Sequence, residues 1–285
     1  MEIRDLANLH FNKIFHAFGQ AFADYEITFS RDEVFSILKR RGFTPELSFA
    51  AFEGNDIVAF TLNGTGMYNN IPTAYDTGTG TIKEFRGKGI AQDIFRHAAP
   101  VLRKAGIRQY LLEVLQNNEK AIAVYSKLGF EVTREFNCFR QEKRLIGGTE
   151  EKGSHLQIEI VPVETGLITA CAAFREFEPS WQNSNESITR AGSDLLSLGA
   201  FVNDDMAGYC VSDPATGDIS QIAVAPQFRR NKIASRLLDK AVGLSEPPGI
   251  KVLNIPSSCT SIPAFLRSKN ITPAVGQFEM TLQLG

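Results

Sequence analysis

The strongest constraint on the fold is an uninterrupted alternation of strand and helix patterns between residues 77 and 130. Residues 77–82 are rich in β-forming residues, and beyond a glycine-containing turn Ile90, Ile94, Ala98 and Val101 recur at helical spacing. Residues 111–115, Leu-Leu-Glu-Val-Leu, predict a buried strand, and a second helical pattern follows them. Such an alternation predicts an α/β fold with a mixed sheet flanked by helices.

The turn at the centre of this run has the chemistry of an anion-binding site. It reads Phe-Arg-Gly-Lys-Gly-Ile-Ala over residues 85–91 and leads directly into a helix. The first N–H groups of a helix have no acceptor within it, and together with the helix dipole they attract phosphate. Gly89 has no side chain that would hold a pyrophosphate away. Since Arg-Gly-Lys-Gly also occurs in surface loops that bind nothing, the turn alone leaves both interpretations open.

The second helix of the run has recognisable ends. Asn117 and Asn118 offer an N-cap, and Gly129 offers a C-cap. Between them an apolar face carries a tyrosine, Tyr125. The sequence therefore predicts strand, turn, helix, strand and helix in that order.

These motifs resemble the signatures of the GCN5-related N-acetyltransferase (GNAT) family. The family's Gln/Arg-x-x-Gly-x-Gly/Ala signature, which cradles the pyrophosphate of acetyl-CoA, is matched by Arg86, Gly89 and Ala91. Its later signature is matched by Asn118, Tyr125, Gly129 and Phe130. The strand Leu-Glu-Val is similar to that of the ribosomal-protein N-terminal alanine acetyltransferases, whose catalytic Glu lies five residues before the Asn, as Glu113 does here. The resemblance covers residues 1–145 well and thins beyond them.

The resemblance implies an acetyl-CoA-dependent N-acyltransferase that acts on a primary amine of a small molecule or of a peptide N-terminus. It also implies a set of residues that bind acetyl-CoA as co-substrate. These are Thr79, Gly80, Thr81, Arg86, Gly87, Lys88, Gly89, Ile90, Ala91 and Asn118.

Acetyl transfer from a thioester needs a neutral amine and a proton for the departing thiolate. Because a side-chain amine has a pKa of ~10.4 and an α-amine ~7.7–8.0, a base assists either one. Glu113 is the best-placed carboxylate, with Asp76 and Glu84 as weaker alternatives, although a strand residue can equally face solvent. Tyr125, with an ordinary pKa of ~10, is the expected proton donor, and core packing is its alternative role.

The rest of the first half agrees with this arrangement. Residues 11–22 carry an apolar helical stripe, and Ser30 with Glu33 forms a capping box that opens a helix ending near Gly42. Residues 47–52 and 57–62 predict a hairpin. We therefore expect a catalytic domain over residues 1–145, followed by a polar, glycine-rich linker at residues 146–155.

Residues 156–285 repeat the pattern in a degenerate form. Strand patterns at residues 198–202, 206–211 and 219–224 precede a Phe-Arg-Arg-Asn-Lys-Ile-Ala turn, whose Arg229 aligns with Arg86. An internal duplication explains the match, although chance similarity between two α/β halves is possible. Lys232 stands where Gly89 stands, and the tyrosine position is Leu266. We expect this second domain to be structural or part of a substrate wall.

Composition narrows the class of protein. A formal net charge of −2 gives no reason to expect nucleic acid or an anionic membrane as partner. No apolar run is long enough to span a bilayer and no secretory signal is recognised, so a cytoplasmic protein is expected. The four cysteines lack paired spacing and are expected to be reduced, and the four histidines show no metal-ligand pattern, so no metal is expected.

Two other functional classes remain open at this level. A non-catalytic acyl-CoA-binding sensor would keep the turn without needing Glu113 or Tyr125. A pseudo-dimeric scaffold for a protein partner would instead expose an apolar patch on the second half. The segments at residues 25–31 and 67–75 are expected to contact the amine, and the chain is expected to be a monomer with two similar halves or a homodimer.

Overall fold

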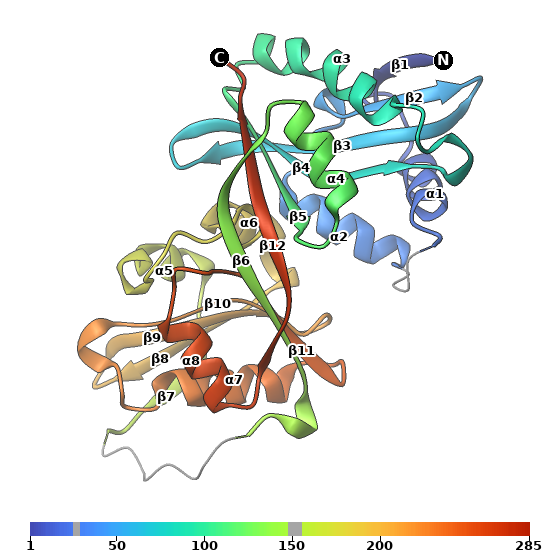
Figure 1. Cartoon of the computed structure of the whole chain (residues 1–285). Coiled ribbons are helices and arrows are strands. Elements are labelled where there is room, and N and C mark those ends of the chain that lie inside the picture. The colour runs from blue at the N-terminus through green and yellow to red at the C-terminus, as the bar shows by residue number, and fades with distance from the viewer. Residues whose placement is uncertain (25–28, 148–155) are drawn as a thin grey trace. The chain divides into compact units, whose positions relative to one another are not determined.

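The structure is a computed structural model that describes residues 1–24, 29–147 and 156–285. The chain forms two compact units (Figure 1). Unit 1 comprises Met1–Val114, Asn118–Thr133 and Glu279–Gly285, and unit 2 comprises Leu115–Asn117 and Arg134–Phe278. Most of the linker expected at residues 146–155 lies outside the described residues, as do residues 25–28 of one expected substrate segment.

The first half of the chain follows the predicted order of elements. The strands are β1 (Glu2–Asp5), β2 (Phe49–Glu53), β3 (Asp56–Tyr68), β4 (Ile71–Thr81) and β5 (Gln109–Leu115). The helices are α1 (Phe11–Ala21), α2 (Arg31–Arg41), α3 (Ile90–Lys104) and α4 (Glu119–Lys127), with 3-10 turns η1 (Pro45–Leu47) and η2 (Lys83–Phe85). The short strand β1 was not predicted from the sequence.

Local sequence determines where these elements begin and end. The capping box before α2 is confirmed, because the Ser30 hydroxyl accepts from the Glu33 N–H and the Glu33 carboxylate accepts from the Ser30 N–H. Gly42 ends α2 in the left-handed conformation, with φ 79°. Asn69 and Asn70, with φ 50° and 62°, form the two-residue turn between β3 and β4, where two consecutive left-handed residues match the twist of the strands.

The sheet of unit 1 has the strand order β1-β2-β3-β4-β5-β12-β6. The β2–β3 hairpin is confirmed, and β3 pairs with β4 along its length in antiparallel register. β4 and β5 are parallel, as expected for strands joined by the helix α3. On one face, α1 and α2 close a core that includes Leu6, Ile14, Val34, Leu38, Phe60 and Leu62.

Unit 2 repeats this plan. Its strands are β7 (Glu159–Pro162), β8 (Leu196–Val202), β9 (Asp205–Asp213), β10 (Asp218–Val224) and β11 (Gly249–Pro256). Its helices are α5 (Thr165–Ala170), α6 (Asn185–Ala191), α7 (Ile233–Leu244) and α8 (Ser261–Ser268). Its 3-10 turns are η3 (Lys143–Leu145), η4 (Ala172–Phe174), η5 (Trp181–Asn183), η6 (Gly192–Asp194) and η7 (Pro226–Phe228).

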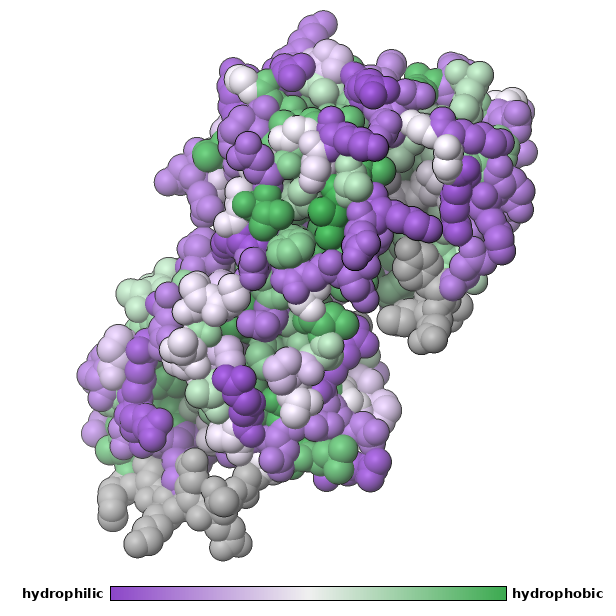
Figure 2. All heavy atoms as spheres, in the orientation of Figure 1, coloured by the Kyte–Doolittle hydropathy of each residue, from purple (hydrophilic) through white to green (hydrophobic). Residues whose placement is uncertain are grey.

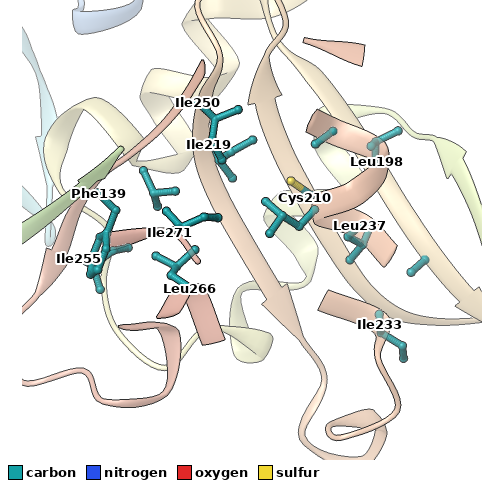
Figure 3. Packing of buried hydrophobic residues seen from close by; sticks show 14 of the residues in the cluster. Phe139, Leu198, Cys210, Ile219, Ile233, Leu237, Ile250, Ile255, Leu266 and Ile271 are labelled. Carbon is teal, nitrogen blue, oxygen red and sulfur yellow. The ribbon is translucent and has the colours of Figure 1, made fainter. Parts of the chain in front are cut away.

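The core of unit 2 lies between its sheet and the helices α7 and α8. Leu237 of α7 and Leu266 of α8 are fully buried together with Cys210 of β9 and Ile219 of β10 (Figure 3). The strand order is β12-β6-β11-β10-β9-β8-β7, and β10 and β11 are parallel. The fold class predicted from the sequence, a mixed sheet with helices in two repeats, is confirmed.

Two long strands contribute to both units. β6 (Glu131–Glu142) starts in unit 1 and continues in unit 2, and β12 (Thr272–Gln283) starts in unit 2 and ends in unit 1. Beyond β12, the Leu284 N–H donates to the carbonyl of Arg108, 2.7 Å away, and the Leu284 side chain is buried. Unit 1 therefore contains the last seven residues of the chain.

The surface is mixed in character. Figure 2 shows apolar residues in green scattered among hydrophilic ones on the viewed face. The exposed large apolar side chains include Phe35 and Met67 in unit 1 and Leu244 and Val275 in unit 2. Within the part of the chain that the structure describes, no helix combines the length and apolarity needed to cross a membrane.

Candidate active site

β4, η2 and α3 position the turn that was predicted to bind phosphate. Gly87 and Gly89 have φ of 76° and 79°, a left-handed conformation that glycine adopts without steric cost. A side chain built at either glycine meets no atom within 4 Å, so the space beside the turn is open. The first helical bond of α3 runs from the Asp93 N–H to the Gly89 carbonyl, 3.1 Å, which leaves the preceding N–H groups without a helical acceptor.

Arg86 braces this turn against the rest of unit 1. Its Nε donates to the Thr81 carbonyl at 3.1 Å, and one terminal nitrogen donates to the Ala21 carbonyl at 2.9 Å. The other terminal nitrogen pairs with the Asp24 carboxylate at 2.8 Å. The hydrogen bond from Arg86, followed by one from Lys83, lowers the pKa of Asp24. The positive charge of Arg86 is thus already matched by a carboxylate, and Lys88 adds a second exposed cation at the turn.

β4 and β5 separate next to the turn. Their parallel register covers only Thr73–Tyr75 of β4 against Gln109–Leu111 of β5, although both strands continue. The predicted residues Thr79, Gly80 and Thr81 lie on the part of β4 beyond this register. On its β3 side this part of β4 remains paired, which leaves its other edge with backbone groups that an extended ligand can meet.

Gly80 lies too close to the core of unit 1 to carry a side chain. A Cβ at this position would lie 2.7 Å from the Phe60 ring and 2.9 Å from the Ala21 Cβ. Because both neighbours belong to the core under α1, a side chain at Gly80 would push α1 away from the sheet.

The structure brings Tyr125 of α4 to Asp76 of β4. The Tyr125 hydroxyl donates to the Asp76 Oδ2 at 3.2 Å, and Thr79 donates to the same oxygen at 2.7 Å. The other carboxylate oxygen accepts from the Gly78 N–H at 2.9 Å. Burial, followed by the charge of Asp76, raises the pKa of Tyr125 well above 10, so the phenol is protonated at neutral pH.

An aromatic cluster supports the Tyr125 ring. Phe130 lies 5.6 Å from Tyr125, centroid to centroid, and also contacts Tyr110 of β5 and Phe95 of α3. Tyr110 is fully buried, and its hydroxyl donates to Asn63 of β3. Tyr125 therefore packs against a core, the alternative role considered from the sequence, and its hydroxyl also donates to Asp76, while its role as proton donor stays a prediction.

Glu113 lies beside a different tyrosine, Tyr75. Burial, followed by the charge of Glu113, raises the pKa of Tyr75 well above 10, and a hydrogen bond to the Glu113 carboxylate adds to the shift. Tyr75 and Asp76 are consecutive on β4, and successive strand residues face opposite sides of a sheet. Glu113 and Tyr125 consequently approach β4 from opposite faces, next to the point where the strands separate.

Asn118 caps α4 as predicted. Its Oδ1 accepts from the Ala121 N–H at 3.2 Å, and α4 begins at the next residue. Arg41 and Asn63 are neighbours of the site that the sequence did not reveal. Arg41 of α2 donates to the Thr77 carbonyl at 3.1 Å and favours the ionised forms of Asp76 and Tyr75. Both residues come from elements far away in sequence, and neither belongs to a motif.

The matching turn of unit 2 has the same backbone but different side chains. Arg229 donates to the Val224 and Phe174 carbonyls and pairs with Glu176 at 2.9 Å, as Arg86 does with Thr81, Ala21 and Asp24. Lys232 precedes α7 with φ 63°, close to that of Gly89. The predicted alignment of Leu266 with Tyr125 also holds, since Ile271 N–H donates to Leu266 as Phe130 N–H donates to Tyr125.

Unit 2 thus retains the geometry of the turn and the bracing arginine, and has Lys232 in place of Gly89 and Leu266 in place of Tyr125. Across the described residues 1–24, 29–147 and 156–285, no group of three or more His, Cys, Asp and Glu side chains is arranged to hold a metal ion.

Comparisons with known proteins add independent observations. A model of the acetyltransferase (GNAT) family matches residues 12–130 and 168–264. N-alpha-acetyltransferase MAK3 of Arabidopsis thaliana is 31% identical over 101 residues, which are 34% of this chain and 53% of that protein. The chain therefore spans about half the length of this curated relative.

Two solved structures cover nearly the whole chain. A tandem GNAT protein from the clavulanic acid biosynthesis pathway is 13% identical with a TM-score of 0.73, covering 100% of this chain and 98% of that one. A GCN5-related N-acetyltransferase from Sphaerobacter thermophilus is 14% identical with a TM-score of 0.69, covering 99% and 95%. At these identities the likeness shows the fold alone.

Proposed function

The chain belongs to the acetyltransferase (GNAT) family, as its two signatures predicted, and we propose that unit 1 transfers an acetyl group from acetyl-CoA to a primary amine. The observation that carries this proposal is the Tyr125–Asp76 pair beside the separation of β4 and β5. The family match supports acyl transfer, and the pair supports a proton donor for it. The open glycine turn supports a pyrophosphate-bearing co-substrate.

Acetyl-CoA supplies the activated acetyl group, and the protein supplies its binding and the proton transfers. Residues Thr79, Gly80 and Thr81 offer backbone groups to the pantetheine chain, and Asn118 at the start of α4 offers its side-chain amide. Gly87, Lys88 and Gly89, with the N–H groups of Ile90 and Ala91, offer the phosphate site. Arg86 holds the turn in place rather than adding free charge.

Tyr125 acts as the general acid. As the amine nitrogen bonds to the carbonyl carbon and the carbon–sulfur bond breaks, the Tyr125 hydroxyl transfers its proton to the departing thiolate. A thiol has an ordinary pKa of ~8.5, well below the raised pKa of Tyr125, so the phenol is the weaker acid and the transfer depends on the basicity of the nascent thiolate. Solvent then reprotonates Tyr125, which completes the step. Asp76 positions the hydroxyl by accepting its hydrogen bond.

Glu113 assists the amine. It lies at Tyr75 on the opposite face of β4 from Asp76, so an amine on that face can lose its proton to Glu113 directly or through water while Tyr125 serves the sulfur. The products are an N-acetylated amine and free CoA thiol. Glu113 releases to solvent the proton that it took from the amine. Tyr125 regains from solvent the proton that it gave to the thiolate, so the protons balance.

A peptide α-amine is the favoured class of acceptor, and a small-molecule amine is the alternative. The support is the N-alpha-acetyltransferase relative, which shares 31% identity over 101 residues. An α-amine also has the lower pKa of the two amine types, ~7.7–8.0, and is easier to deprotonate near neutral pH.

The deciding experiment is an acetyl-CoA-dependent screen with thiol release as readout. Peptide N-termini, free amino acids, polyamines and aminoglycosides are offered separately, and each hit is verified by the mass of its acetylated product. We expect turnover with peptides that carry a free α-amine and none with the same peptides after N-terminal blocking. Tight acetyl-CoA binding without turnover on any amine would instead favour the acyl-CoA-binding sensor.

A further inference from the structure

Unit 2 contains a cavity of about 530 Å³ between β10, β11, η7, α7 and α8. Its position in unit 2 corresponds to the separation of β4 and β5 in unit 1, because β10 and β11 pair only at Asp218 and Lys251. The size falls within the ~300–1,000 Å³ that small-molecule sites occupy. The cavity does not depend on the proposed activity of unit 1.

The lining of this cavity is apolar where unit 1 is polar. Ile219, Ile222 and Val224 of β10 stand at the positions of Asp76, Thr79 and Thr81. Phe177, Phe228, Ile262 and Phe265 complete the wall, and all four remain only partly buried. Ile219, Ile233 and Ile255, labelled in Figure 3, join the cavity to the core of the unit. Folding leaves this apolar surface open, which favours an apolar ligand.

The charges around the cavity are mainly positive. Four cationic side chains line it, Arg175, Arg229, Arg230 and Lys232, against the single carboxylate of Glu176. Two of these cations are already paired, Arg229 with Glu176 at 2.9 Å and Arg175 with Glu178 at 3.8 Å. Arg230 and Lys232, both in the left-handed conformation, lie in the turn that leads into α7, whose first N–H groups attract anions as well. An anion is therefore favoured at this end of the cavity.

From these observations we propose that unit 2 binds an aliphatic carboxylate, with its chain in the β10–β11 cavity and its carboxylate at Lys232 and Arg230. Lys232 stands where Gly89 leaves room beside the turn for a pyrophosphate, and its single charge matches one carboxylate instead. The replacement of Asp76, Thr79 and Tyr125 by Ile219, Ile222 and Leu266 removes polar groups that such a chain could not satisfy. Binding is non-covalent, and no bond is made or broken.

The test is calorimetric titration of the full chain with hexanoate, octanoate and decanoate. Each added methylene buried in the cavity should tighten binding about fourfold. Decanol, which has the chain without the anion, should bind at least about tenfold more weakly than decanoate, because a charged hydrogen bond is lost. Affinity that is independent of chain length, or equal for decanol and decanoate, would overturn the proposal.

Two variants in the cavity and one control outside it locate the site. Lys232→Gln keeps a long side chain at a position where lysine already accepts a left-handed backbone, and it should weaken decanoate binding about tenfold. Lys240→Gln, on an exposed position of the same helix outside the cavity, is the matched control and should change nothing. Ile222→Thr, which introduces the residue found at the matching position of unit 1, should weaken binding through lost apolar contact. Equal effects of both lysine variants would contradict the assignment.

An acetyl-CoA titration of the wild-type chain separates this proposal from a second co-substrate site. We expect decanoate to leave the acetyl-CoA affinity unchanged and acetyl-CoA not to compete with decanoate. Displacement of decanoate by acetyl-CoA would show that the cavity is a second co-substrate site and would overturn the proposal. Because binding is the readout, the result stands whether or not unit 1 proves to be an acetyltransferase.

Discussion

At the scale of single residues, the site depends on how three side chains on β4 and α4 share hydrogen bonds. Asp76 accepts from Thr79, Gly78 and Tyr125, so its carboxylate fixes the Tyr125 hydroxyl at the edge of β4. The sequence could single out Tyr125 through its spacing from Asn118 and Gly129. It could not reveal the Asp76 contact, because a strand and a helix separated by 49 residues meet only through tertiary packing.

Tyr125→Phe tests the general acid. The substitution removes one hydroxyl and keeps the ring against Phe130, so folding and acetyl-CoA affinity should survive. Turnover should fall by roughly 10²–10⁴-fold, the usual contribution of a positioned acid. Steady-state kinetics with the best amine of the screen measure this, and Tyr110→Phe, which removes a buried hydroxyl outside the proposed chemistry, is the control. Near-normal turnover of Tyr125→Phe would assign the proton to another group or to solvent.

Glu113→Gln tests the assistance given to the amine. At low pH most of the amine is protonated and needs a base, whereas above its own pKa most of it is already neutral. The variant should therefore lose most activity at low pH and recover as the pH rises. A pH profile of kcat/KM for wild type and variant measures the ratio, and a constant ratio across the profile would speak against Glu113 as base.

Asp76→Asn tests the electrostatic environment of the site through stability. Burial raises the pKa of Asp76 in the folded protein, against the opposing hydrogen bonds from Thr79 and Tyr125. A carboxyl with a raised folded-state pKa stabilises the fold below its unfolded pKa, ~3.9, and loses this contribution as the pH rises through the raised value. The free energy of unfolding of wild type relative to Asp76→Asn should therefore decline with pH across that window.

Urea denaturation of both proteins at a series of pH values measures this difference. Asp93→Asn, which removes an exposed carboxylate from the first turn of α3, controls for the loss of one negative charge. A wild type that gains stability over the variant as pH rises would show that the hydrogen bonds outweigh burial and that the pKa is lowered.

At the scale of secondary-structure elements, the sequence predicted what local rules govern. The capping box of α2, the Asn118 cap of α4 and the β2–β3 hairpin follow from residues close together in the chain, and all were confirmed. β1 and the course of β6 and β12 were missed, because their positions depend on pairing with strands far away in sequence. The η2–α3 turn combines both cases, since its glycines were predicted and the bracing of Arg86 by Ala21 and Asp24 was not.

Gly89→Lys tests this turn. Lys232 shows that the same backbone accepts lysine at φ 63°, so the variant should fold with a cost of ~1–2 kcal/mol for the left-handed conformation. It should nevertheless abolish acetyl-CoA binding, because the side chain enters the open space beside the turn. Calorimetry should give one acetyl-CoA per wild-type chain and none for the variant. Gly106→Lys, at a left-handed glycine with equally open surroundings beyond the end of α3, is the matched control and should bind normally.

At the scale of the whole molecule, neither half of the sequence contains all of one unit. Unit 1 needs Glu279–Gly285, in which Met280 and Leu284 are buried, and β12 lies between β5 and β6 in its sheet. Thr133 of β6 adds hydrogen bonds to Glu279 and Thr281. A duplication of two independent domains would have kept every strand of a unit in one half. Here each unit contains strand segments from both halves of the sequence, because β6 and β12 each contribute residues to both units.

The fragment of residues 1–146 tests this dependence. Without β12, the edges of β5 and β6 lose their partner and the apolar surface under Leu284 is exposed, so the fragment should unfold at a lower temperature than unit 1 of the full chain. A synthetic peptide of residues 272–285 should raise that temperature with the logarithm of its concentration once it is in excess over its Kd, because it binds only the folded fragment. The same peptide with Leu284→Ala should bind at least about 30-fold more weakly, since removing a buried leucine costs ~2–5 kcal/mol. Thermal unfolding followed by circular dichroism measures the unfolding temperature of the fragment alone, with the peptide and with the Leu284→Ala peptide. A fragment that is as stable as the full chain and does not respond to the peptide would show that unit 1 is complete without its C-terminal residues.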